Sequence, residues 1–311
     1  MPELPEVETV RRGLERLIVG KTIIDVEHDW PKSFPNAHAD VEQFLKGASV
    51  VSVKRRAKVL LIELSSSYSL VIHLKMTGQL VFVAEATKET RNKKHEIRGR
   101  AKKETATELR FGAGHPNDSL VGELPDRSTR VIFAFSDGSR LYFNDQRKFG
   151  WVRLLPTLQV PEIDFFKKVG PEPLADDFTS SVFIERVRIR ANTTIKAALL
   201  DQTVLAGVGN IYADESLWGA RIHPASKVKD ITDRQLATLY SELRYVLNLS
   251  IEKGGSTDRN YVNAEGKRGS YIDFARVFRR ERLPCPRCNT IIEKSKVAGR
   301  GTHVCPTCQI R

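Results

Sequence analysis

The first nine residues, MPELPEVET, offer an amine and several carboxylates close together. Pro2 is small enough for Met1 to be removed, which would leave a secondary amine, and α-amino groups have a pKa of roughly 8. Glu3 and Glu6 are three residues apart, so a helix starting here would place both carboxylates on one face. Taken alone, the stretch favours an ordinary helix start over a catalytic site, because prolines and acids are common there.

Two CxxC pairs near the C-terminus are the most specific local signal. Four thiolates at this separation can surround one metal ion tetrahedrally, and we predict zinc, with iron–sulfur or redox thiols as alternatives. A closed set of four ligands leaves no open position, so the ion is expected to be structural. The ligands are Cys285, Cys288, Cys305 and Cys308, and a β-hairpin between the pairs would carry Arg300 at its tip.

Three further segments have residue types suited to nucleic acid. The glycines of Ala206–Asn210 suit phosphate binding at a helix start, or an ordinary corner between helices. The basic run Lys54–Lys58 precedes an apolar strand and suits a groove that follows a phosphate backbone, or simple solvation. Arg147 and Phe149 share one tight turn and could enter a base stack, as could the flexible apolar Met76.

Composition favours a globular protein with a polyanionic partner. The chain has 311 residues, 41% of them hydrophobic, with a formal charge of +12 and a pI of about 9.6. Without an amphipathic basic helix or a lipidation motif, nucleic acid is favoured over an anionic membrane surface. The sequence has no apolar run of the roughly 18 residues that a membrane span requires, and its acidic start is unlike a signal peptide. We therefore expect a cytoplasmic location.

Hydrophobic periodicity divides the chain into a β-rich and a helical part. A helix ending near Gly20 is followed by short β-branched runs, which predict an antiparallel sheet system. These runs are Thr22–Val26, Val50–Val53, Val59–Leu64, Ser69–Leu74, Leu80–Val83, Arg130–Phe135, Arg140–Asn144 and Trp151–Leu155. Residues 84–127 interrupt them and are predicted to be a charged insertion, partly disordered or a short helix. Helices are predicted at Phe178–Arg190, Ile195–Asp201, Ile211–Ala220 and Asp233–Lys253, the last capped by Thr232.

Eight segments, in this order, resemble the bacterial formamidopyrimidine-DNA glycosylases of the Fpg/Nei family. They are MPELPEVET, KRRAK, HLKMTG, DQRKFG, GPEPL, LAGVGNIYADE, IEKGGST and CPRC…GRGTHVCPTCQ. The resemblance implies an α+β fold: an N-terminal helix with an antiparallel β-sandwich, a helix-two-turns-helix domain and a zinc-finger hairpin. The expected divisions are a catalytic domain over 1–158, a linker over 159–176, the helical domain over 177–276 with a loop at 256–275, and the finger over 277–311.

The resemblance also implies a reaction. The chain would be a monomeric, nucleoid-associated base-excision-repair glycosylase with AP lyase activity, removing 8-oxoguanine and formamidopyrimidines from damaged double-stranded DNA. Pro2 would form a Schiff base with C1′, with Glu3 as acid/base and Glu6 in support. Lys58 would assist β-elimination and Arg300 δ-elimination. The expected DNA-binding residues are Met76, Ser128, Arg130, Arg147, Phe149, Lys196 and Asn210.

The chain departs from the family pattern at three places. DQRKFG stands for the usual DPRRFG, and Phe278-Arg-Arg280 for a glycine-containing turn. A DNA-contacting histidine expected near Ser128 is absent, and Arg130 is a candidate to replace it. Two alternative functions stay open: an endonuclease VIII-like enzyme for oxidised pyrimidines, whose usual opening has glycine where Leu4 stands, and a catalytically silent zinc-finger DNA-binding protein.

Overall fold

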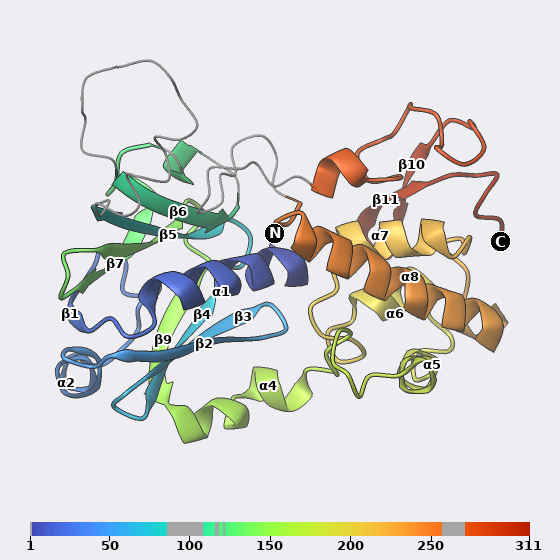
Figure 1. Cartoon of the computed structure of the whole chain (residues 1–311). Helices are drawn as coiled ribbons and strands as arrows, with labels where there is room; N and C mark the ends of the chain where they lie inside the picture. The colour runs from blue at the N-terminus through green and yellow to red at the C-terminus, as the bar shows by residue number, and fades with distance from the viewer. Residues whose placement is uncertain (1, 86–107, 116–117, 121, 257–270) are drawn as a thin grey trace, which may run out of the picture.

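The computed structural model describes residues 2–85, 108–115, 118–120, 122–256 and 271–311. A β-rich half and a helical half lie side by side, and the chain begins between them (Figure 1). A small two-stranded hairpin packs on the helical half. This arrangement confirms the predicted α+β architecture, in which the N-terminus is placed where all the parts meet.

Two antiparallel sheets form the β-rich half. The first has the order β1 (Ile23–His28), β7 (Thr129–Phe135), β8 (Arg140–Asp145), β5 (Gly78–Glu85) and β6 (Glu108–Gly114). The second has the order β2 (Val50–Arg56), β3 (Val59–Leu64), β4 (Tyr68–His73) and β9 (Trp151–Pro156). Apolar side chains of both sheets share one core, as expected for a sandwich. The turn predicted at 136–139 joins β7 and β8, with Gly138 at a φ of 82°.

Helix α1 (Leu4–Ile18) closes the open side of this sandwich. It contacts β2, the edge strand of one sheet, and β6, the edge strand of the other. Its buried face includes Val7, Val10 and Leu14, which are fully buried in the shared core. The apolar residues that recur at helical period in the sequence therefore form the face of α1 that fixes the N-terminus against the sandwich.

Residues 108–114 correct one prediction from the sequence. Residues 108–114 of the charged insertion are neither a helix nor disordered, because they form β6 and pair with β5 along its length. Phe111 of β6 packs directly on α1, where a Cβ added to Gly13 would lie 2.0 Å from its ring. The local strand signal is weak, because the sequence ELRFGAG contains two glycines and follows a long charged stretch. Residues 86–107 lie outside the described part of the chain.

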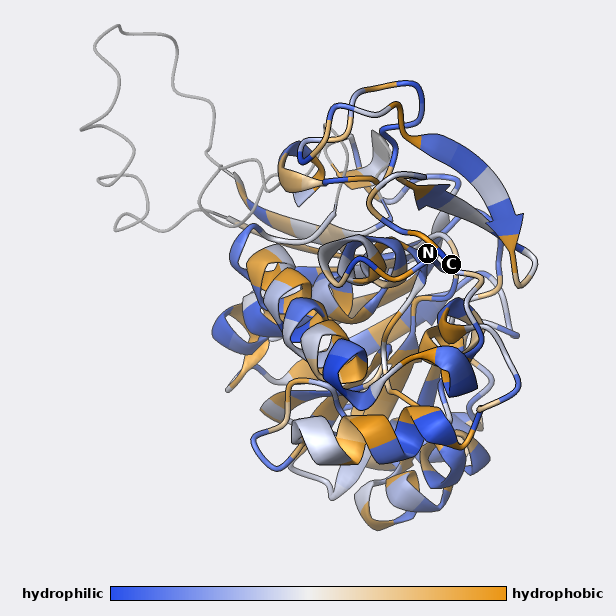
Figure 2. Cartoon of the chain, turned by 90° about the vertical axis from the view of Figure 1, so that its right-hand side faces the viewer, coloured by the Kyte–Doolittle hydropathy of each residue, from blue (hydrophilic) through white to orange (hydrophobic). Residues whose placement is uncertain are grey.

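Four main helices build the other half around a second core: α5 (Ser180–Arg188), α6 (Ile195–Leu200), α7 (Asn210–Gly219) and α8 (Asp233–Glu252). Thr232 caps α8 as predicted, and its hydroxyl accepts a hydrogen bond from the Gln235 amide. Helix α8 has an apolar side and a polar side (Figure 2). The apolar side belongs to the second core, in which α8 contacts α7 and α5. Short helical segments complete the chain: α2 (His38–Asp40), η1 (Val41–Leu45), η2 (Asp118–Leu120), η3 (Thr157–Glu162), α4 (Asp164–Lys168), η4 (Val228–Asp230) and η5 (Tyr271–Phe274).

The linker between the halves is bound to the turn that carries Lys58. Glu172 accepts hydrogen bonds from the guanidinium groups of Arg55, at 2.8 Å, and Arg56, at 3.1 Å. It also accepts one from the backbone amide of Ala57, at 2.5 Å. Two of the basic residues that suggested a phosphate groove therefore bind the protein's own carboxylates. In the described residues, no helix is long and apolar enough to cross a bilayer.

Candidate active site

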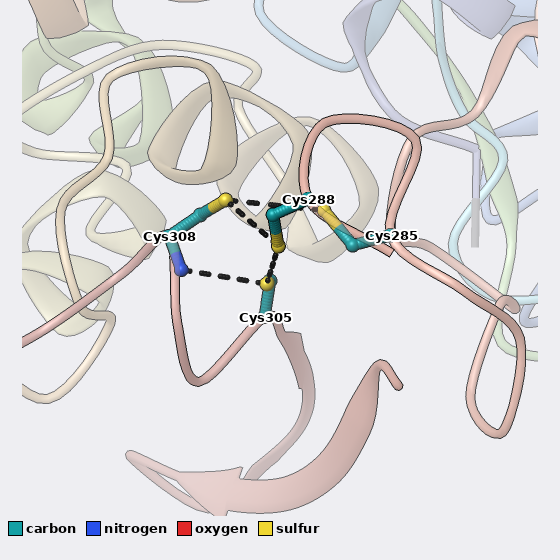
Figure 3. A group of neighbouring side chains, drawn as sticks. All are labelled: Cys285, Cys288, Cys305 and Cys308. Atoms are coloured by element: carbon teal, nitrogen blue, oxygen red, sulfur yellow. Dashed lines mark hydrogen bonds between the residues drawn. The ribbon is translucent and has the colours of Figure 1, made fainter. Parts of the chain in front are cut away.

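The four cysteines converge at one point of the C-terminal hairpin (Figure 3). Their Sγ atoms all lie within 4.8 Å of one another, and the Cys288 Sγ is 3.4 Å from the Cys305 Sγ. Tetrahedral Zn–S bonds of about 2.3 Å require sulfur separations near 3.8 Å, so the thiolates fit the ion. The site holds one structural zinc ion, as predicted.

The zinc site fixes the hairpin formed by β10 (Glu293–Val297) and β11 (Arg300–Val304). Ala298 and Gly299 form its two-residue turn, and both have positive φ angles, 51° and 74°. Such a turn matches the twist of the two strands. Arg300 is the first residue after the turn and is exposed, so the hairpin presents its guanidinium at the tip.

A cavity of about 540 Å³ lies where the chain start meets the other parts of the molecule. Pro2, Glu3 and Glu6 line it from the N-terminus, and Lys58 lines it from the turn between β2 and β3. Arg300 lines it from the hairpin. Residues that are up to 298 positions apart are thus brought to one site, which no local pattern in the sequence could establish.

The glycine-rich segment before α7 holds the chain start in place. The amide of Leu4 donates a hydrogen bond of 3.0 Å to the carbonyl of Gly207. A Cβ on Gly207 would lie 2.7 Å from Leu4, and one on Gly209 would lie 2.2 Å from the Glu3 carboxyl carbon. Both glycines are therefore required by close approach of the N-terminus, a reason that neither sequence interpretation of this segment included.

The Glu3 carboxyl is buried and carries its proton more tightly than an exposed glutamate. Burial raises the pKa of Glu3 to about 7, against the opposing charge of Lys58, and the nearby Glu6 raises it further. One oxygen accepts a 3.1 Å hydrogen bond from the amide of Ile211. The other oxygen is buried and has no hydrogen-bond partner among the described residues. It is thus available to a ligand in the cavity.

Glu6 is held by three hydrogen bonds, so its orientation is well determined. Its Oε2 accepts from the Glu3 amide at 2.8 Å. Its Oε1 accepts from the Tyr212 hydroxyl at 2.5 Å and from the Ser256 amide at 2.8 Å. Burial and the charges of the two glutamates raise the pKa of Tyr212, so this hydroxyl keeps its proton. Ser256 leads into residues 257–270, so most of the loop expected at 256–275 lies outside the described residues.

The Lys58 ammonium is nearly buried and its Nζ donates a 3.0 Å hydrogen bond to the carbonyl of Val208. Burial lowers the pKa of Lys58, while the charges of Glu3 and Glu6 act in the opposite direction. A lowered pKa increases the share of neutral amine, which can accept a proton.

Asn210 lies at the first turn of α7 and also lines the cavity. Its Oδ1 is buried and without a hydrogen-bond partner in the described part of the chain. The free amides of a helix start favour an anionic group nearby. This location is compatible with the phosphate contact expected from the sequence.

Met76, Arg147 and Phe149 are exposed in the β-rich half. Met76 is 39% and Phe149 55% exposed, which is unusual for large apolar side chains. The Arg147 guanidinium lies 4.9 Å from the centre of the Phe149 ring. Met76 lines the cavity, so the exposed group continues from the cavity rim outward.

The buried carboxylate of Asp145 connects the two loops that carry these residues. It accepts hydrogen bonds from the Thr77 hydroxyl and from the amide of Gly150, the latter at 2.6 Å. It also accepts one from the amide of Arg147, at 3.2 Å. The loop after β4 and the turn after β8 therefore form one unit.

Two of the expected DNA-binding residues are buried and bound within the protein. Ser128 is 2% exposed and donates a hydrogen bond of 2.7 Å to Asp126. Arg130 is 5% exposed, pairs with Asp29 and donates to the carbonyl of Asp145 at 3.0 Å. Burial of both side chains does not favour direct contact with DNA.

Lys196 is fully buried and joins the helical half to the hairpin. Its Nζ contacts Asp214 at 2.6 Å and donates to the Gly301 carbonyl at 3.0 Å and the Thr302 hydroxyl at 2.8 Å. Two of its hydrogen-bond partners, Gly301 and Thr302, therefore directly follow Arg300 in the chain. A supporting function for the hairpin fits this environment better than the DNA contact expected from the sequence.

Two residues that were not predicted as site residues, His115 and Arg279, also line the cavity. Arg279 has a φ of 57°, so the segment Phe278–Arg280 keeps a left-handed position where the resemblance led us to expect a glycine-containing turn. His115 follows β6 and reaches the cavity only because β6 pairs with β5. Its position depends on long-range strand pairing and has no local signal.

Family models match three parts of the chain. A formamidopyrimidine-DNA glycosylase N-terminal domain matches residues 1–152, and the helix-two-turns-helix domain of the same enzymes matches 169–261. A zinc finger found in Fpg and isoleucyl-tRNA synthetases matches 282–310. The chain thus carries three matched segments in the order of the β-rich half, the helical half and the hairpin.

Complete proteins match along their whole length. Formamidopyrimidine-DNA glycosylase of Chloroflexus aurantiacus is 40% identical, over 100% of this chain and 98% of that protein. The protein of the same name from Pelotomaculum thermopropionicum is 39% identical, over 99% of each. Among solved structures, Lactococcus lactis Fpg bound to DNA with an abasic site has a TM-score of 0.81 at 33% identity, with 99% of this chain and 100% of that one covered. MutM bound to DNA containing carbocyclic 8-oxo-G has a TM-score of 0.80 at 34% identity, with 100% of both chains covered.

The fold, the cavity and the three matched domains define an enzyme of the base-excision type. The chain belongs to the formamidopyrimidine-DNA glycosylase family.

Proposed function

We infer that this protein is a DNA glycosylase with AP lyase activity that removes oxidised purines from double-stranded DNA. The observation that carries the inference is the cavity in which Pro2, Lys58 and Glu3, whose pKa is raised to about 7, meet. Family membership supports the same reaction class. An enzyme that acts on a base must take it out of the duplex, and the cavity is the site available to receive it.

Pro2 is the proposed nucleophile. After Met1 is removed, its secondary amine attacks C1′ of the damaged nucleotide. The base leaves with the electrons of the glycosidic bond and takes up the proton that the amine loses. Glu3, with a pKa of about 7, supplies a proton as the sugar ring opens and the C1′–N iminium forms. Glu6 holds the Glu3 amide and so orients the chain start.

Lys58 and Arg300 are proposed to act after the base has left. The iminium makes the 2′ proton acidic, so its removal expels the 3′ phosphate. The neutral share of Lys58 can take part in this proton transfer. Arg300, at the hairpin tip on the same cavity, can stabilise the phosphate that leaves in the second elimination on the 5′ side. Hydrolysis of the imine then restores the amine.

The exposed residues Met76, Arg147 and Phe149 are proposed to fill the gap left by the removed base, and Asn210 to bind a phosphate near it. Insertion of apolar side chains between base pairs compensates for lost stacking. In this proposal the β-rich half, 1–158, is the catalytic domain, followed by the linker over 159–176, the helical domain over 177–276 and the finger over 277–311. The enzyme acts as a monomer in the cytoplasm, close to the nucleoid.

Borohydride trapping tests the nucleophile. The reductant is added while the full-length protein reacts with a duplex that contains one 8-oxoguanine, and the trapped peptide is mapped by mass spectrometry. We expect the DNA adduct on the N-terminal nitrogen of Pro2. Pro2→Glu retains Met1, because a large second residue blocks its removal, and this variant should give no adduct.

The outcome that would overturn the assignment is an adduct on Lys58. The same assay with thymine glycol tests the substrate class. More rapid trapping on thymine glycol than on 8-oxoguanine would favour the endonuclease VIII-like alternative, while an absence of any adduct would favour a protein that only binds DNA.

A further inference from the structure

Strand β6 ends beside the loop that carries Met76, and His115 follows it directly. The register pairs Gln79 of β5 with Gly114 of β6. The His115 amide donates a 3.1 Å hydrogen bond to the Gly78 carbonyl, and the Gln79 side-chain amide donates to the His115 carbonyl. The backbone at His115 is therefore fixed on both sides.

Gly114 makes this close arrangement feasible. Its φ of 127° is a conformation that residues with side chains rarely adopt, and a Cβ there would lie 2.5 Å from the Gly78 carbonyl oxygen. Phe111 anchors the same strand on α1, the helix that begins at the catalytic amine. The position of His115 is thus tied to the position of Pro2 by packing within one core.

The His115 imidazole is suited to a neutral hydrogen-bonding partner. The side chain is half-buried at the cavity that Pro2 and Glu3 line. Burial lowers the pKa of His115, while the charge of Asp145 acts in the opposite direction. A neutral imidazole has one donor and one acceptor nitrogen. Arg279 and Arg300 bring positive charge to the same cavity, so phosphate has better partners there than a neutral ring.

We propose that His115 contacts the damaged base in the cavity by hydrogen bonding and contributes to its recognition. The proposal rests on the proposed function, since it requires a damaged base to enter the cavity. It makes β6 a substrate-recognition element that is supplied by the interrupting segment 84–127. An abasic nucleotide keeps its sugar and phosphates but lacks the base. A contact to the base can therefore be told apart from a contact to sugar or phosphate by comparing the two substrates.

The test compares two duplexes under single-turnover conditions: one with 8-oxoguanine and one with a preformed abasic site. We expect His115→Ala to slow base release by about tenfold, the effect of losing one hydrogen bond of about 1.4 kcal/mol. Strand cleavage at the abasic site should stay within about twofold of wild type, which also establishes that the variant is folded. His115→Gln keeps a donor and an acceptor and should recover part of the lost rate.

His38→Ala is the matched control, because the His38 side chain is 88% exposed and lies outside the cavity. It should change neither rate. Equal losses of His115→Ala on both duplexes would assign His115 to the backbone or to packing and overturn the proposal, and so would an unchanged base-release rate. If the wild-type protein released no base at all, the proposed function would fail, and the inference with it.

Discussion

Glu3 is the residue whose environment most directly indicates its chemistry. A glutamate on a helix surface would be ionised at neutral pH, whereas burial beside Glu6 leaves a substantial share of Glu3 protonated. The counteracting charge of Lys58 keeps this pKa near neutrality. Acid catalysis is most effective when the pKa of the acid is close to the working pH.

We predict that base release by the wild-type protein declines as pH rises through about 7. The sign follows from the raised pKa: the protonated form is the active acid, and it is lost above the pKa of Glu3, about 7. Glu3→Gln should remove this limb and slow base release by about 100-fold or more. The measurement is the pH–rate profile of single-turnover base release.

Glu15→Gln serves as the control, because Glu15 lies on the same helix and its side chain is 48% exposed. It should keep the wild-type profile. If Glu3→Gln retained the alkaline limb, another group would have to be the acid.

Among the elements, the turn between β2 and β3 has two functions. Its Lys58 faces the cavity, while Arg55, Arg56 and Ala57 bind Glu172 of the linker. The Arg56 guanidinium also donates to the Gly170 carbonyl at 2.7 Å. Because the same short segment makes both contacts, the placement of Lys58 depends on the attachment of the linker.

Glu172→Gln should lower the free energy of unfolding by about 2 kcal/mol, the scale of a hydrogen bond to a charged group. It should also slow strand cleavage at a preformed abasic site, since Lys58 would be held less firmly. Urea unfolding and single-turnover cleavage measure the two effects.

Glu162→Gln is the comparison, because Glu162 forms an exposed ion pair with Lys167 and its side chain is 69% exposed. Exposed pairs contribute little, so its unfolding midpoint should remain close to wild type. Equal midpoints for both variants would mean that the linker contact does not stabilise the protein.

At the scale of the whole molecule, the helix at the chain start and the zinc site belong to separate cores. The sandwich and the finger have distinct buried clusters, and the finger is joined to α7 through the buried carboxylates of Asp214 and Glu215. Asp214 accepts from the His303 amide at 2.9 Å, and Glu215 accepts from the Val277 amide at 2.9 Å. In the proposed mechanism, zinc affects the reaction by placing the hairpin that carries Arg300.

Zinc removal should therefore disrupt the finger and leave the sandwich folded. We expect a chelator, or Cys285→Ser, to weaken binding to an abasic-site duplex by about tenfold or more, because the Arg300 contact is lost. The sandwich should still unfold cooperatively on heating. Zinc content, a binding titration and a thermal unfolding curve are the measurements.

Restoring zinc to the chelated protein should recover binding, whereas Cys285→Ser should not recover fully. Tight binding by a protein shown to be free of zinc would contradict the proposed supporting function of the finger.

Short-range features of this chain could be predicted from its sequence. The two CxxC pairs, the Thr232 cap, the turn at 136–139 and the periodic face of α1 each depend on residues within a few positions of one another. Steric preferences, local hydrogen bonds and hydrophobic periodicity involve residues a few positions apart, so their outcome can be predicted from the sequence. The motifs, taken jointly, were also sufficient to indicate the family.

Contacts between distant residues were decided only by tertiary structure. Arg55 and Glu172 are 117 positions apart, and Lys196 and Thr302 are 106 apart. Whether such a cation binds DNA or an internal carboxylate depends on which partner folding brings near it. The same holds for His115, which strand pairing carries to the cavity, and for Glu3, whose pKa is raised by burial that the chain order does not reveal.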